Sequence, residues 1–174
     1  MEPAIEFKKI FEQHRRSVIG FALRRVSKDD AEDVVAETFL VAWRRLDQLP
    51  AEPLPWLLGV ARKVIATHQR GNRRLANLRD VLRMNPGRGQ LDSFPDDRGD
   101  LAAAFNALPP RDQEVLMLIG WDGLTVGQAA QVLGCSPESL TLRLHRARKR
   151  LEARIDSEAP FRSPRPIPTT EEAR

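Results

Sequence analysis

The chain has 174 residues, 41% of them hydrophobic, and its 28 basic and 24 acidic side chains give a net charge of +4. No apolar stretch approaches the roughly 20 residues of a membrane-spanning helix, and one cysteine with three scattered histidines excludes an intrachain disulfide and a Cys-rich zinc site. Since the N-terminus also lacks the apolar segment of a signal peptide, we expect a cytoplasmic protein without membrane insertion, structural metal or cofactor.

Helical periodicity runs through nearly the whole chain, and strand signals are absent. Apolar residues within 7–22 recur at three- and four-residue spacing, which places them on one face of a first helix. Asp29 is expected to cap a second helix that runs to about Leu46, with an acidic first turn that the helix dipole favours. The predicted apolar face of this second helix is Ala31, Val35, Phe39, Ala42 and Leu46.

A loop over residues 47–55 contains three prolines, and a third helix follows that is expected to end at Gly71. From 75 to 100 the helical pattern gives way to Gly, Pro and Asp, which indicates a linker. Residues 101–107 and 110–120 are predicted to form two further helices. The sequence thus predicts an all-α protein of two small helical domains, residues 1–74 and 101–155, joined by a flexible linker, 75–100, and followed by a disordered Pro-rich tail, 156–174.

The clearest local signal lies near the end of the second domain. Thr125 and Gln128 fit a capping box at the start of a short helix, which Gly134 ends. Ser136 then caps a last helix with Pro137 at its first position. Two capped helices joined by a turn form the helix-turn-helix plan, in which the second helix lies in the DNA major groove.

Charge is strongly segregated along the chain. Residues 29–37 carry five acids and no base, whereas 53–79 carry six bases and no acid, and 143–150 carry five bases and no acid. Such segregation indicates a nucleic acid partner and a separate protein partner, although solvated helix faces give the same pattern. On the last helix, the helical wheel favours nucleic-acid binding over a merely solvated face, because it places a basic face opposite the apolar stripe. The stripe is Leu140, Leu144, Ala147 and Leu151; the opposite face is Leu142, His145, Arg146 and Lys149, flanked by Thr141, Arg143 and Arg148.

These segments resemble a known family. LTVGQAAQVLGCSPESLTLRLHRARKRL resembles region 4 of bacterial extracytoplasmic-function (group IV) sigma factors of the sigma-70 family. DAEDVVAETFLVAWRRL and PWLLGVARKVIATHQRGNRR resemble region 2, and the whole match covers about residues 5–155 in the family's order. The resemblance implies a sigma factor, not itself an enzyme, that directs core RNA polymerase to promoters for transcription initiation. Its implied partners are core polymerase, through the β′ clamp and β flap, promoter DNA and an anti-sigma factor.

The resemblance also assigns residues to three surfaces. For the polymerase it implies Asp30, Asp33, Val34, Glu37, Thr38, Phe39, Trp43 and Arg44, of which Phe39 fits a core position at least as well. For the melted −10 element it implies a basic track of Arg62, Lys63, Arg70, Arg73 and Arg74, with a base pocket built from Asp47 to Glu52 and the start of the next helix. For the −35 duplex it implies Ser139, Thr141, Leu142, Arg143, His145, Arg146, Arg148 and Lys149.

Two other functions remain open at this level. One is a helix-turn-helix regulator that binds duplex DNA as a dimer, and the other is an interaction adaptor with no DNA role. Catalytic interpretations lack the necessary residues, because Gly87-x-Gly89 has neither the third glycine nor the preceding strand of a dinucleotide loop. Cys135 has no histidine placed by the sequence to activate it.

Overall fold

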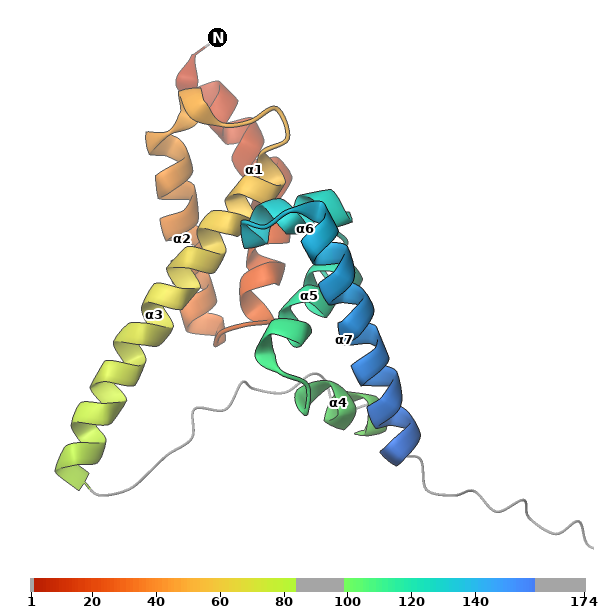
Figure 1. Cartoon of the computed structure of the whole chain (residues 1–174). Coiled ribbons are helices and arrows are strands. Elements are labelled where there is room, and N and C mark those ends of the chain that lie inside the picture. The colour runs from red at the N-terminus through yellow and green to blue at the C-terminus, as the bar shows by residue number, and fades with distance from the viewer. Residues whose placement is uncertain (1, 84–98, 159–174) are drawn as a thin grey trace, which may run out of the picture.

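A computed structural model describes residues 2–83 and 99–158 of the chain, with side chains for 2–71 and 101–157. Every regular element in these ranges is helical, which confirms the predicted all-α class (Figure 1). In chain order the elements are α1 (Pro3–Leu23), α2 (Lys28–Arg44), the short 3-10 helix η1 (Leu46–Gln48), α3 (Pro53–Arg83), α4 (Gly99–Asn106), α5 (Pro110–Gly120), α6 (Val126–Leu133) and α7 (Pro137–Glu158).

The helices α1, α2 and α3 pack on one another and form the N-terminal module. The apolar stripe that the sequence predicts on α1 supplies its core, with Val18, Phe21 and Ala22 fully buried. Phe7 and Phe11 of α1 meet Phe39 of α2 edge to face, at ring-centroid distances of 6.3 and 4.8 Å. Such aromatic pairs add stability beyond the area they bury.

The boundaries of α2 and α3 differ from the sequence expectations. Ser27, not Asp29, caps α2, because its extended backbone lets the hydroxyl accept a hydrogen bond from the Asp30 backbone N–H at 3.3 Å. α3 begins at Pro53, since a proline in the first turn has no N–H that the helix would use. The expected stop at Gly71 is wrong, because α3 continues to Arg83. A glycine in a helix interior costs about 1 kcal/mol relative to alanine, which good helix formers on either side can offset.

The C-terminal module consists of α4 to α7, and its caps agree with the sequence predictions. The capping box of Thr125 and Gln128 is present in both directions, at 3.0 and 3.2 Å. Gly134 adopts a left-handed φ of 66° at the end of α6, a conformation that glycine adopts without strain. Ser136 accepts a hydrogen bond from the Ser139 backbone N–H at the start of α7. The predicted helix-turn-helix of α6 and α7 is therefore confirmed as a structure.

The two modules pack against each other, which the sequence expectation of two tethered domains did not include. α3 of the N-terminal module lies along α6 of the C-terminal module, and the buried apolar residues of both form one continuous cluster (Figure 1). The helices approach closely at Gly59, where an added Cβ would lie 3.9 Å from the Val132 Cα. The predicted boundaries of the linker and the tail need correction, because 75–83 belong to α3, 99–100 to α4 and 156–158 to α7. The rest of both segments, 84–98 and 159–174, lies outside the described residues.

Gly59→Ala is expected to raise the free energy of unfolding by about 0.5–1 kcal/mol, since alanine is the better helix former and its methyl group meets only ordinary van der Waals contacts. Urea unfolding of the full chain measures this change. Gly71→Ala is the matched control, because a Cβ there meets nothing within 4 Å. A loss of stability confined to Gly59→Ala would contradict the spacing of α3 and α6.

Candidate nucleic-acid interface

The outer face of α7 is arranged as the helical wheel predicts. Leu140, Leu144 and Ala147 are buried against the other helices of the C-terminal module. Leu142 is 50% exposed and stands among cationic side chains on the opposite face. All eight residues assigned to the −35 duplex are exposed: Ser139, Thr141, Leu142, Arg143, His145, Arg146, Arg148 and Lys149. Their accessibility agrees with the prediction, and their role in DNA binding stays a prediction.

The first turn of α7 is fixed by local hydrogen bonds. The hydroxyl oxygens of Ser136 and Ser139 lie 3.2 Å apart, within hydrogen-bond distance, and the Thr141 hydroxyl donates to the Pro137 carbonyl at 2.9 Å. Both Ser139 and Thr141 therefore keep acceptor lone pairs at the outer surface. Hydrogen bonds from its own backbone N–H and from Ser136 lower the pKa of Glu138, so this carboxylate stays ionised.

The basic residues predicted on α3 fall into three groups. Lys63 and Arg70 are exposed, and the Arg70 Nε donates to the Ala66 carbonyl at 3.0 Å. Arg62 instead forms a two-point ion pair with Glu114 of α5, at 2.7 and 3.3 Å. This hydrogen bond raises the pKa of Arg62. The side chains of Arg73 and Arg74 lie outside the described residues.

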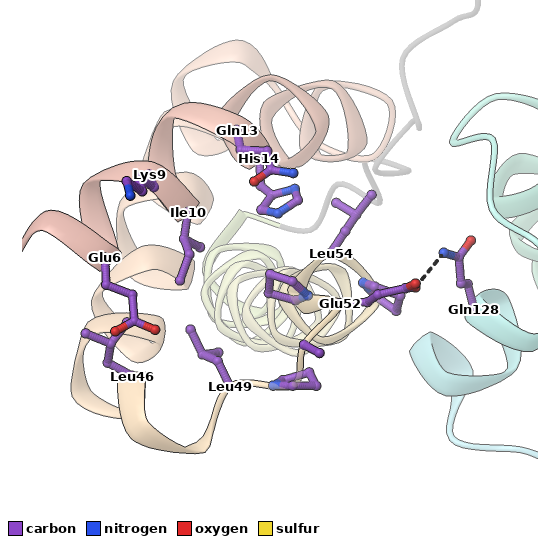
Figure 2. Close-up of a pocket in the computed structure, with 14 residues that line it drawn as sticks. Glu6, Lys9, Ile10, Gln13, His14, Leu46, Leu49, Glu52, Leu54 and Gln128 are labelled. Carbon is purple, nitrogen blue, oxygen red and sulfur yellow. Dashed lines mark hydrogen bonds between the residues drawn. The ribbon is translucent and has the colours of Figure 1, made fainter. Parts of the chain in front are cut away.

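A cavity of about 610 Å³ opens beside the loop that precedes α3 (Figure 2). Of the predicted segment, Leu49, Pro50, Ala51 and Glu52 line it together with the first turn of α3, whereas Asp47 and Gln48 do not. Its other walls were not predicted. α1 contributes Glu6, Lys9, Ile10, Gln13 and His14, and α6 contributes Gln128, whose side-chain amide donates to Glu52 at 3.5 Å.

The outer face of α2 carries the accessible part of the predicted polymerase surface. Asp33, Glu37 and Arg44 are exposed, and Trp43 is 45% exposed while its ring packs edge to face on Phe7 at 5.0 Å. The Glu37 carboxylate lies 2.8 Å from the His68 Nε2. Asp30 is half-buried, and its carboxylate accepts a hydrogen bond from the Ser27 hydroxyl at 2.8 Å.

Three residues assigned to this surface need correction. Val34, Thr38 and Phe39 are buried, because α2 packs on both α1 and α3 and thus buries more than one stripe. They support the helix from within and do not form its outer surface. Leu40, which the sequence reading missed, is 48% exposed. Its position three residues after Glu37 and four before Arg44 was the available signal.

The contact between the modules contains a buried charge cluster that sequence reasoning also missed. The Asp122 carboxylate, in the turn after α5, is 2% exposed and pairs with Arg24 and with Arg25, the latter at 2.9 Å. The Arg25 guanidinium also donates to the Phe21 carbonyl at 2.9 Å and lies 3.6 Å from the centroid of the Phe21 ring. Burial lowers the pKa of Arg25, and Asp122 opposes that shift.

No group of three or more His, Cys, Asp or Glu side chains in the described ranges is arranged to hold a metal ion. None of the helices in those ranges is both long and apolar enough to cross a membrane.

Comparison with known proteins identifies similar chains. A family profile described as Sigma-70 region 2 matches residues 10–75, and one described as Sigma-70, region 4 matches residues 98–151. The chain is 33% identical over 132 residues to the ECF RNA polymerase sigma factor EcfG of Rhodopseudomonas palustris, which covers 72% of this chain and 71% of that protein. It is 26% identical over 166 residues to the RNA polymerase sigma factor NccH of Alcaligenes xylosoxydans, covering 87% of each.

A solved structure shows the same arrangement of helices. The sigma factor RpoE of Bartonella quintana, crystallised with the anti-sigma factor NepR, superimposes with a TM-score of 0.65 at 26% sequence identity. The superposition covers 87% of this chain and 98% of that chain.

Proposed function

This chain belongs to the extracytoplasmic-function branch of the sigma-70 family, and we propose a specific division of its surfaces between polymerase and promoter. The chain is an RNA polymerase sigma factor for promoter-specific transcription initiation. We place region 2 in residues 1–74 and region 4 in 101–155, with 75–100 between them. Core polymerase carries out the chemistry, so we assign no catalytic step to this chain and place its action in the cytoplasm.

The outer face of α2 docks on core polymerase. Asp33 and Glu37 supply negative charge one helical turn apart, and the exposed apolar pair Leu40 and Trp43 follows on the same helix. Acidic groups beside apolar side chains suit a basic partner, because charge steers the encounter while the apolar contact excludes water. The β′ clamp is the surface that the family resemblance assigns to this helix.

The outer face of α7 binds the −35 duplex. Arg143, His145 and Arg146 are exposed near the N-terminal half of the helix, where a recognition helix contacts base edges. Arg148 and Lys149 lie further along and suit phosphate contacts, which orient the protein on the duplex. Leu142 fits the methyl group of a thymine in the major groove.

The loop and first half of α3 bind the melted −10 element. Taking a base out of a duplex costs a few kcal/mol per unstacked step, which a pocket and a basic track can offset. The cavity beside residues 49–52 supplies the pocket, and Lys63 with Arg70 supplies the exposed part of the track. Arg62 joins this track only after its pair with Glu114 is broken.

An anti-sigma factor is a further proposed partner. The solved RpoE of Bartonella quintana is bound to one, and its superposition covers 87% of this chain. We infer that an anti-sigma factor also binds this chain.

The observation that carries the proposal is the exposed basic face of α7, opposite a buried stripe, in the same chain as the exposed acidic face of α2. The test is in vitro transcription of a genomic fragment library by purified core RNA polymerase, with and without this protein. Discrete start sites that appear only with the protein support the proposal and deliver the promoter sequence. No start sites and no co-elution with core polymerase would contradict it and favour a dimeric regulator.

Replacing both Arg146 and Lys149 by alanine is expected to lower holoenzyme affinity for promoter DNA at least about tenfold and to reduce the salt slope by about one phosphate contact, that of Lys149. Filter binding at several salt concentrations measures both quantities. Arg15→Ala with Arg16→Ala removes the same charge from exposed positions on α1 and is expected to have little effect. An adaptor without a DNA role would show no difference between the two double variants.

A further inference from the structure

α1 contributes several polar side chains to the wall of the cavity. His14 lines the cavity although its side chain is only 8% exposed, and its ring faces the open space near Leu54 (Figure 2). It forms no hydrogen bond or ion pair with any of the other described residues. Gln13 lies beside it, and Lys9 stands one turn earlier on α1. The fully buried side-chain nitrogen and oxygen atoms without a partner among the described residues belong to Arg24, Arg25 and Thr38 and not to His14. The His14 ring nitrogens therefore remain accessible from the cavity, where a bound group can reach them.

The chemistry of this wall suits a nucleobase edge. Burial lowers the pKa of His14, so the ring is neutral at pH 7 and presents one N–H donor and one nitrogen acceptor. Depending on its tautomer, the nitrogen that faces the cavity can therefore either donate to an acceptor or accept from a donor on the edge of an unpaired base. The Gln13 amide offers the same pair of functions, as glutamine does when it reads adenine.

Charge within the cavity determines which part of a nucleotide enters it. Glu6 and Glu52 line the cavity from opposite elements, and their carboxylates repel a phosphate group. Lys9 is exposed at the α1 side, where it can attract the backbone. The remaining lining is largely apolar and suits the faces of a planar ring: Ile10, Leu46, Leu49, Pro50 and Leu54.

We propose that α1 forms the specificity wall of the base pocket and that His14 hydrogen-bonds the edge of one unpaired −10 base, selecting which base is accepted. This inference rests on the proposed function, because the occupant is a base of the melted promoter strand. The inference adds α1 to the loop 47–55 and the basic track of α3 as a third part of the −10 site. His14 is a specificity-determining residue and takes no part in a covalent step.

The first test uses the wild-type chain in holoenzyme with core polymerase. Photoreactive thio-bases are placed one at a time along the −10 non-template strand of a promoter that the holoenzyme melts. The crosslinked peptide is then identified by mass spectrometry. Crosslinking of one position to the α1 peptide that contains His14 supports the proposal. Crosslinks confined to other peptides of the chain would overturn it, while failure to melt any promoter would contradict the proposed function instead.

The second test measures base preference. His14→Leu keeps a similar side-chain volume but removes the hydrogen-bonding groups, and His14→Gln restores a donor and an acceptor. Holoenzyme binding is measured with promoters that carry each of the four bases at the crosslinked position. In His14→Leu, the discrimination among the four bases is expected to fall roughly tenfold, which is the size of one good base contact. His14→Gln is expected to regain part of this discrimination or to change the preferred base.

The control is Ser17→Ala, an exposed position one turn further along α1, which should leave base preference unchanged. Circular dichroism and urea unfolding verify that each variant is folded. If a folded His14→Leu variant still initiates at the promoter and discriminates among the four bases as the wild type does, the inference is wrong. If His14→Leu does not fold, the crosslinking result on the wild-type chain decides.

Discussion

Asp122→Ala is expected to separate the two helical modules while each keeps its helices. The Asp122 carboxylate is nearly inaccessible and is the acid that pairs with both Arg24 and Arg25 across the module contact. Removing one partner of a buried ion pair costs about 3–5 kcal/mol. Asp122 supplies both the hydrogen bond and the larger attraction that offset the burial of Arg25, and Glu114 adds a weaker attraction. Arg24 and Arg25 also repel each other once the acid is gone, as the effect of Arg24 on the pKa of Arg25 indicates.

Separation relieves this cost, because both guanidiniums then return to water. The equilibrium between packed and separated modules should shift by at least about a hundredfold, the factor that corresponds to roughly 3 kcal/mol. Small-angle scattering measures the change as a larger radius of gyration. Far-ultraviolet circular dichroism should stay nearly constant, since the helices themselves are not altered.

Two further variants make this experiment specific. Glu114→Ala breaks the Arg62 pair, whose partners are partly exposed, and such pairs are worth only about 0–1 kcal/mol. Asp156→Ala removes the same single charge from an exposed position on α7. Both should leave the radius of gyration close to that of the wild type. An unchanged radius for Asp122→Ala would contradict the view that the buried cluster holds the modules together.

The module contact also lies beside the surfaces assigned to the −10 element. Arg62 pairs with Glu114 of α5, and Gln128 of α6 lines the cavity and contacts Glu52. Separated modules would free Arg62 and remove one wall of the cavity. Asp122→Ala should therefore bind single-stranded −10 oligonucleotides more tightly than the wild-type chain, as measured by fluorescence anisotropy.

Local features of the fold could be read from the sequence because their causes are local. The capping box of Thr125 and Gln128, the left-handed Gly134 and the cap at Ser136 each depend on a few neighbouring residues, and all three agree with the prediction. The buried and exposed faces of α7 follow from helical spacing alone. The same reasoning failed at Gly71, because a glycine is also tolerated within a helix.

The interfaces between elements could not be read in the same way. Asp122 and Arg25 are 97 residues apart in the sequence, and neither shows a local pattern that identifies the other. Val34 and Thr38 share an acidic-looking segment with Asp33 and Glu37, but α2 packs on two helices and buries them. His14 fits the apolar stripe of α1, and only the packed loop shows that it faces a cavity.

Reversing the charge of Asp33 and Glu37 together, by Asp33→Arg and Glu37→Arg, is expected to abolish binding to core polymerase. Like charges across an interface cost several kcal/mol, so the affinity should fall at least about a hundredfold. The fold should survive, because both side chains are exposed and, among the residues with described side chains, the one hydrogen bond affected is that of Glu37 with His68. Analytical gel filtration with core polymerase measures the complex, and thermal unfolding verifies the fold.

A matched double reversal at Glu2, which precedes α1 as its N-cap, and at Glu12 of α1 changes the net charge by the same amount at exposed positions. It should leave the complex intact, because the prediction depends on the position of the acids and not on overall charge. Leu40→Ala supplies an independent arm, since an exposed apolar side chain in a desolvated contact loses binding energy when truncated, at any ionic strength. We expect the loss of polymerase affinity in Leu40→Ala to persist in high salt, and the loss in the single charge reversals to depend on salt. Together these two results would place apolar and ionic contacts on one surface. Co-elution of the Asp33/Glu37 variant with core polymerase at wild-type affinity would remove α2 from the docking surface.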